Sequence, residues 1–187
     1  MTDSDSDARL AARLAALRLQ RGWSLDALSE ATGISRASLS RIERAETSPT
    51  AALLNRLCVA YGITMSRLLR DIEEETPQLL HAAQQPVWHD VASGFQRRSI
   101  SPPASDFKAE VIEGVLRPGA RIDYDAPPLH GMEQHIWLQS GGLTFTLDDQ
   151  RWTLQAGDSL RFHLTGRSTF EADAERGARY LLVVCKP

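Results

Sequence analysis

The 187-residue sequence is poor in cysteine and contains no long hydrophobic run. Its two cysteines, Cys58 and Cys185, form no Cys-x-x-Cys pair, so we expect buried thiols rather than a disulfide framework or a zinc ribbon. No segment approaches the roughly 20 uncharged apolar residues of a membrane-spanning helix. Residues 1–7 are acidic, whereas a secretory signal begins with basic residues. The sequence therefore predicts a cytoplasmic protein without a membrane segment.

The chain also lacks a marked overall charge, but its charges are unevenly distributed. The net charge is −3, yet residues 7–70 hold ten arginines against five acidic residues. Residues 76–187 hold 11 basic and 13 acidic side chains, and the remaining acidic residues cluster at 1–6 and 71–75. Since a nucleic acid responds to a local basic surface rather than to net charge, the two halves are expected to face different partners.

The residue pattern changes at the same place as the charge. Residues 8–72 are rich in Ala, Leu and Arg with apolar spacings of three and four, which is typical of helices. Residues 86–187 contain most of the twelve glycines and short alternating runs, which favour strands. The sequence therefore predicts a helical domain over residues 1–72 with a disordered acidic tail at 1–7, a linker over 73–85, and an all-β domain over 86–187.

Two short predicted helices separated by a tight turn are the most informative feature of the helical domain. Ser24 and Ser35 are suited to cap them, and the turn is Thr32-Gly33-Ile34. At 100° per residue, Leu39 and Ile42 share the buried face of the second helix. Its opposite face carries arginines and small residues: Arg36, Ala37, Ser40, Arg41 and Arg44. Such a face can enter the major groove of DNA and donate hydrogen bonds to guanine or phosphate, which predicts a helix-turn-helix.

Arginines on one helix face can also form an ordinary solvated surface, and the surrounding sequence decides between the two interpretations. Residues 25–35, 38–44, 48–50 and 53–63 together resemble the lambda-repressor-like, XRE-type helix-turn-helix family. The resemblance implies five helices, the last near Ser66–Leu69, of which the third reads operator DNA. Other members often have glycine where Ala45 and Glu46 stand, a difference confined to a loop.

The family pattern also implies which residues contact DNA. It places Arg36, Ala37, Ser38, Ser40 and Arg41 near base edges or phosphates. Ser24, Ser48 and Thr50 stand at helix starts, where hydroxyl and backbone N–H groups meet phosphate. The candidate set also includes Ser35, which caps the reading helix, and Arg44 on its exposed face. Glu43 is expected to be structural, pairing within the helical domain, because phosphate would repel a carboxylate.

The second half consists of short predicted strands between glycine- and proline-containing corners, which favours a sandwich or barrel. Residues 116–120, 136–143 and 155–162 resemble the cupin family. The resemblance implies a jelly-roll barrel, and many cupins hold a metal through two histidines and a glutamate in their first motif and a histidine in their second. The two resemblances together imply a known bacterial regulator architecture, a five-helix lambda-repressor-like domain followed by a cupin jelly-roll β-barrel.

Three of the four cupin metal positions carry other residues. The first three positions fall at Pro128, His130 and Gln134, and the fourth falls at or near Ser168. One imidazole with an amide does not hold a divalent ion against water, so we expect no metal and no other cofactor. A different site built from His130, His135 and His163 is disfavoured, because strand alternation turns His135 and His163 outward when Gln134 and Phe162 point inward.

The barrel interior is expected to form a small pocket for a polar effector. Its predicted lining is Tyr124, His130, Gln134, Ile136, Leu138, Phe162 and Ser168. Imidazole, amide and hydroxyl groups that converge in an apolar cavity suit ligand binding better than a reaction. In the alternative interpretation, side chains fill the pocket and the barrel only dimerises.

The sequence therefore favours a transcriptional regulator that is not an enzyme. We expect it to bind double-stranded operator DNA as a homodimer and to sense an unidentified small molecule. Outward-facing His135 and Trp137 and the apolar segment 180–184 are the expected dimer contacts. The alternative is a metal-dependent cupin enzyme with a DNA-binding appendage, which the replaced metal positions disfavour.

Overall fold

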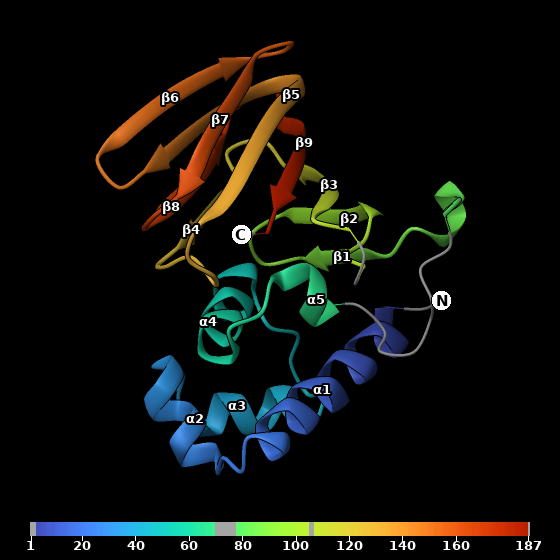
Figure 1. The fold of residues 1–187 in the computed structure, drawn as a ribbon, viewed down its shortest axis with the longest axis vertical. Coiled ribbons are helices and arrows are strands. Elements are labelled where there is room, and N and C mark those ends of the chain that lie inside the picture. Colours follow the sequence, from blue (N-terminus) through green and yellow to red (C-terminus); the bar gives the residue numbers. More distant parts are fainter. Residues whose placement is uncertain (1–2, 70–77, 105–106, 187) are drawn as a thin grey trace.

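The computed structural model describes residues 3–69, 78–104 and 107–186, and it contains a helical bundle packed beside a curled β-sheet (Figure 1). The helices of the bundle are α1 (Asp3–Gln20), α2 (Leu25–Thr32), α3 (Arg36–Glu43), α4 (Ala51–Tyr61) and α5 (Met65–Leu69). The five-helix fold expected for an XRE-type domain is therefore confirmed. Within the described ranges, no helix is long and apolar enough to cross a membrane.

Leucines at helical spacing form the core of the bundle. Leu14 of α1, Leu28 of α2, Leu39 of α3, and Leu54 and Leu57 of α4 are at most 2% exposed. Full burial of such a side chain stabilises the fold by about 1.5–3 kcal/mol. This core fixes α3 on α1 and α2, and so determines which face of α3 remains on the surface.

The N-terminal end of α1 differs from the sequence-based expectation. The helix begins at Asp3, so residues 3–7 are helical where a disordered tail was predicted. Aspartate and serine are residue types that favour helix N-termini, and this local preference accounts for the helical start. Of the predicted linker, residues 73–77 lie outside the described residues, and residues 78–85 include the short 3-10 helix η1 (Ala82–Gln84).

The turn that ends α3 holds a non-glycine residue in a left-handed conformation. Ala45 has φ of 56°, its N–H donates to the Ile42 carbonyl at 3.0 Å, and the Glu46 N–H donates to the Arg41 carbonyl at 2.9 Å. These bonds satisfy carbonyls at the helix end. A side chain in this backbone region costs about 1–2 kcal/mol, which glycine avoids.

Replacing Ala45 by glycine should therefore stabilise the protein. We expect the free energy of unfolding to rise by about 0.5–1 kcal/mol, since the relief of strain exceeds the extra entropy that glycine loses on folding. The matched variant Ala37→Gly, within α3, should lower the free energy of unfolding. Urea titration followed by circular dichroism measures both, and a less stable Ala45→Gly variant would contradict the strain argument.

The strands form one curled antiparallel sheet, as the cupin resemblance implies. They are β1 (Val87–Asp90), β2 (Phe95–Ser101), β3 (Ala109–Leu116), β4 (Arg121–Tyr124), β5 (Met132–Leu147), β6 (Gln150–Gln155), β7 (Ser159–Leu164), β8 (Ser168–Ala172) and β9 (Ala178–Cys185). Their order is β1-β2-β3-β9-β5-β8-β4, with β6 and β7 also paired to β5. This arrangement confirms the jelly-roll fold and makes β5 the strand around which the sheet curls (Figure 1).

Strand β5 is continuous through Gly141 and Gly142, one of the glycine-containing segments that the sequence predicts to be corners between short strands. Its 16 residues run on past a bulge between Leu138 and Ser140, where the register with β9 shifts. Gly141 has φ of 80°, and a Cβ there would lie 2.1 Å from the Gly177 carbonyl oxygen. The predicted corner is therefore a bend that lets one strand serve both halves of the barrel.

The two cysteines lie in different environments. Cys58 of α4 is fully buried, and this burial raises the pKa of its thiol to about 12. Cys185, at the end of β9, is only half-buried, so the expectation of two buried thiols holds for Cys58 alone.

Helices α4 and α5 lie against the open end of the barrel, between it and the α1–α3 layer (Figure 1). At the start of α4, the Ala51 N–H donates to the Asp90 carboxylate at 2.9 Å. Further along α4, the Asn55 side chain donates to the Ala126 carbonyl at 2.8 Å. In α5, the Ser66 hydroxyl accepts a hydrogen bond from the guanidinium of Arg97 in β2. The two domains therefore meet through buried polar contacts.

Candidate DNA-binding surface and buried cavity

Helix α3 presents the expected face to solvent. Leu39 and Ile42 are buried, whereas Arg36, Ala37 and Arg41 are exposed. Ser35 caps the helix by accepting a hydrogen bond from the Ser38 N–H at 3.2 Å. Ser38 and Ser40 are half-buried beside them. The candidate DNA-contacting residues of α3 thus share one surface.

The arginines on this face differ in how they are held. Arg36 forms an ion pair with Asp26 at 3.2 Å. Arg44 donates to the Ser40 hydroxyl at 2.6 Å and pairs with Glu46 at 2.7 Å, which lowers the pKa of the Glu46 carboxyl. The Arg41 side chain makes no hydrogen bond or ion pair with other described residues, so it can bind DNA without breaking one.

The three predicted phosphate contacts at helix starts have different surroundings. Ser24 is exposed and caps α2 by accepting a hydrogen bond from the Ala27 N–H at 3.0 Å. Ser48 is also exposed, and its hydroxyl donates to the Asp7 carboxylate at 3.1 Å. Thr50 caps α4 and is half-buried. Because Asp90 already accepts from the next N–H of α4, this helix start faces the β domain.

Glu43 has the structural role expected of it. Its two carboxylate oxygens each accept a hydrogen bond from the Arg18 guanidinium at 2.8 Å, and both side chains are largely buried. The bidentate hydrogen bonds raise the pKa of Arg18. The pair ties the C-terminal end of α3 to α1 and thereby orients the reading helix.

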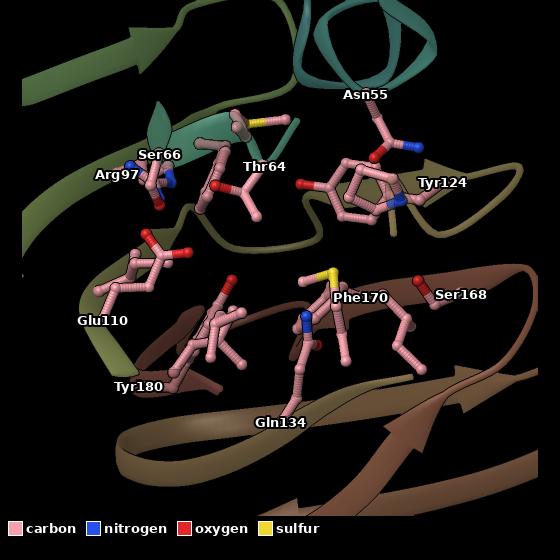
Figure 2. A pocket seen from close by; sticks show the side chains of 18 of the residues that line it. Asn55, Thr64, Ser66, Arg97, Glu110, Tyr124, Gln134, Ser168, Phe170 and Tyr180 are labelled. Carbon is pink, nitrogen blue, oxygen red and sulfur yellow. The ribbon is translucent and has the colours of Figure 1, made fainter. Parts of the chain in front are cut away.

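A cavity of about 90 Å³ lies between the open end of the barrel and helices α4 and α5 (Figure 2). The helical domain contributes Asn55, Thr64, Met65 and Ser66 to its lining. The β domain contributes Phe95, Arg97, Glu110, Ile112, Tyr124, Ala126, Pro128, Met132, Gln134, Leu164, Ser168, Phe170, Tyr180, Leu182 and Val184. The cavity is therefore a barrel interior that the DNA-binding domain closes.

Three of the predicted pocket residues, Tyr124, Gln134 and Ser168, line this cavity. His130 does not, which corrects the prediction: it is exposed, because it precedes Gly131 in the turn before β5 begins at Met132.

Ile136, Leu138 and Phe162 also lie outside the cavity lining. Their side chains point inward as strand alternation predicts, but they belong to the packed part of the barrel. The ring centroids of Phe145 and Phe162 are 4.5 Å apart there. Aromatic packing thus fills one end of the barrel and leaves the cavity at the end nearer the helices.

Two buried charged residues of the cavity were not found by sequence analysis. Arg97 is 4% exposed and donates to the hydroxyls of Ser99, at 3.0 Å, and Ser66. Glu110 is 1% exposed, and its carboxylate lies near the hydroxyls of Ser66 and Thr64, although no hydrogen bond of normal geometry reaches either oxygen. The sequence signal that could have revealed Arg97 was the period-two alternation of Phe95, Arg97 and Ser99, which places all three on the buried face of β2.

Burial perturbs both charged groups. It lowers the pKa of the Arg97 guanidinium, an effect that the charge of Glu110 opposes. It raises the pKa of the Glu110 carboxyl, while Ser66 and Arg97 act in the opposite direction. Burial likewise raises the pKa of the Tyr124 and Tyr180 hydroxyls, so both remain protonated donors at neutral pH.

The residues of this cavity do not fit the metal site of many cupins. Pro128, Gln134 and Ser168 line it at three of the ligand positions, and His130 lies outside. Among the described residues, no cluster of three or more His, Cys, Asp or Glu side chains is placed to hold a metal ion. His135 and His163 lie on the outer face of the sheet, as alternation predicted, and His135 contacts Glu133 at 2.7 Å.

The fold and the arginine-bearing surface define a DNA-binding regulator joined to a cupin-type barrel. A helix-turn-helix domain model matches residues 9–71. The HTH-type transcriptional regulator SutR of Escherichia coli is 32% identical over 153 residues, which cover 82% of this chain and 81% of that protein. The chain belongs to this family of helix-turn-helix transcriptional regulators, as an XRE-type member with a C-terminal cupin domain.

Solved structures are also similar to this chain. An HTH_3 family transcriptional regulator from Vibrio cholerae has a TM-score of 0.80 and 28% identity, covering 100% of this chain and 99% of that one. The cupin_2 domain of an XRE family regulator from Enterobacter cloacae has a TM-score of 0.47 and 19% identity, covering 50% of this chain and 98% of that domain. The likeness to the Vibrio protein extends over both domains.

Proposed function

We propose that this regulator binds its operator as a homodimer in the bacterial cytoplasm and that a small molecule in the barrel cavity changes its affinity for DNA. The observation that carries the proposal is that α4 and α5 of the DNA-binding domain form one wall of the cavity. A ligand there contacts both domains at once. The polar groups that converge in an otherwise apolar cavity support a binding site rather than a reaction centre.

Ser66 connects the cavity to the DNA-binding domain. It accepts a hydrogen bond from Arg97 and stands in α5, which follows α4 directly. A ligand that competes for Arg97 alters this contact and shifts the docking of α5 on the barrel. The change in DNA affinity equals the ligand's preference for one of the two arrangements, and couplings of about 1–3 kcal/mol are typical.

The proposed DNA contacts are the exposed groups on and around α3. Arg36, Arg41 and Arg44 provide forked donors, and Ala37, Ser38 and Ser40 allow close approach to the groove. Ser24 and Ser35 cap α2 and α3, and Ser48 lies in the loop between α3 and α4. Hydroxyls at such places can reach phosphate. Thr50 is the last member of the set. The N–H of Ala51, the next residue, already donates to Asp90.

The proposed dimer contact is an apolar strip on the outer face of the sheet. Trp137 of β5 pairs in register with Leu181 of β9, and Val183 of β9 pairs with Val111 of β3. Trp137 is 47% exposed, and the other three side chains are half-buried. A second copy of the sheet would remove this strip from water. Because β9 is paired with β3 on one side and with β5 on the other, it has no free edge to which a second copy could add a strand.

Selection of operator fragments from a random duplex pool tests the DNA-binding part of the proposal. The affinity for a selected operator should fall linearly with salt on logarithmic axes, because arginine–phosphate contacts release counterions. An affinity that ignores salt, or no preference among duplexes, would contradict sequence-specific binding. The titration repeated with host-cell extract metabolites, separated by size, tests the effector.

The metal-dependent enzyme remains the second candidate, favoured only by the barrel fold. The proline, amide and hydroxyl at three ligand positions give such an enzyme no means to hold its metal. Metal analysis of the purified protein separates the two functions: stoichiometric iron, manganese or zinc that disappears in His130→Ala would support the enzyme.

A further inference from the structure

The cavity contains one buried positive and one buried negative side chain that do not satisfy each other. The Arg97 guanidinium donates to Ser66 and Ser99 rather than to Glu110. The carboxylate of Glu110 projects into the cavity beside Tyr180, and the hydroxyls of Ser66 and Thr64 approach its oxygens without completing a hydrogen bond of normal geometry (Figure 2). A buried carboxylate that is so weakly hydrogen-bonded is costly, so a ligand that supplies stronger donors is favoured.

The charge balance of the cavity restricts the ligand. Arg97 and Glu110 carry opposite formal charges, and both are almost completely buried. A ligand with a single charge would leave one uncompensated charge in a low-dielectric site. A ligand that carries one charge of each sign preserves neutrality and can satisfy both groups.

We propose that the cavity binds a small zwitterion with one ammonium and one carboxylate group, such as a small amino acid. The ammonium donates to Glu110, and the carboxylate lies on the Arg97 side of the cavity. This inference rests on the proposed sensing function and specifies the chemical class of its effector.

The remaining walls fit a molecule of this kind. The volume of about 90 Å³ restricts the ligand to a few non-hydrogen atoms. The rings of Tyr124, Phe170 and Tyr180 line the cavity; their faces attract an ammonium group, and their apolar surfaces pack against its carbon neighbours. Gln134 and Ser168 lie across the cavity from Arg97, where they can bond a further polar group of the ligand (Figure 2).

Calorimetry on the full-length protein without DNA tests the proposal. The probes are glycine, alanine, serine and β-alanine, and the controls are ethylamine and propionate, which carry a single charge each. At least one zwitterion should bind and, near saturation, raise the melting temperature by several degrees. Each single-charge match should bind at least tenfold more weakly. If no zwitterion binds, or if a single-charge match binds equally well, the proposal is wrong.

The variant Glu110→Gln tests the role of the carboxylate while keeping the size of the side chain. It should weaken zwitterion binding about tenfold or more, because a charge-assisted hydrogen bond is lost. Glu113→Gln is the matched control, since Glu113 stands on the same strand but pairs with Arg179 outside the cavity, at 2.6 Å. Undiminished binding by folded Glu110→Gln would overturn the assignment. Because the assay contains no DNA, its failure leaves operator binding untouched, and the operator titration can fail independently.

Discussion

Replacing Arg41 with alanine is expected to weaken operator binding by about 1–3 kcal/mol, the discrimination typical of a side chain that bonds a base edge. Arg41 is exposed on the proposed DNA-contacting face of α3, and its side chain has no hydrogen bond or ion pair with the rest of the described chain. Its guanidinium can therefore approach DNA without first losing a partner. Arg36 and Arg44 must give up Asp26 and Glu46, so their replacement should have smaller effects.

Titrations on the operator and on a scrambled duplex show which kind of contact Arg41 makes. Loss of a base contact reduces the preference for the operator, whereas loss of a phosphate contact weakens both duplexes equally and flattens the salt dependence. Arg161→Ala, an exposed arginine of β7, is the matched control and should change neither affinity. Operator binding by Arg41→Ala that equals the wild type would remove α3 from the proposed interface.

A glutamate in place of Trp137 should separate the dimer into monomers and reduce operator affinity by a hundredfold or more. The substitution places a charge in the apolar strip that we propose two copies share. A dimer reads two half-sites about one helical turn apart, and linking two binding events raises affinity by about 10²–10⁴. Light scattering at micromolar concentration gives the mass, and operator titration gives the affinity.

The control for this experiment is Leu79→Glu. Leu79 is an exposed apolar residue, 69% accessible, in the segment before β1 rather than on the strands of the strip. This variant should retain the mass and affinity of the wild type. If the wild-type protein is itself monomeric at micromolar concentration, or if Trp137→Glu remains a dimer, then the sheet face is not the dimer interface.

The DNA-binding half could be predicted from sequence because its information is local. Caps, a tight turn and helical spacing within a few dozen residues determine that Leu39 is buried and Arg41 exposed. The alternation that turns Trp137 outward and Gln134 inward is equally local. Each of these features needs only the neighbours of a residue along the chain.

The cavity depends on contacts that no local pattern contains. Alternation places Arg97 and Glu110 inside the barrel, but which end of the barrel remains open depends on the packing of Phe145 with Phe162 and Phe170. The wall formed by α5 depends on how two domains dock. His130 shows the same limit, because β5 begins only at Met132 and leaves His130 exposed in the preceding turn.

The Asp90 carboxylate makes the folding of one domain depend on the other. Helix α4 completes the hydrogen bonding of its first turn only when Asp90 of the barrel accepts from the Ala51 N–H, and Asp90 in turn is held by the Ser93 N–H at 3.1 Å. The two domains should consequently unfold in a single cooperative transition rather than as two independent units. For the same reason, a chimera that joins this helical bundle to an unrelated barrel would leave a helix start unsatisfied unless it brought an acceptor of its own.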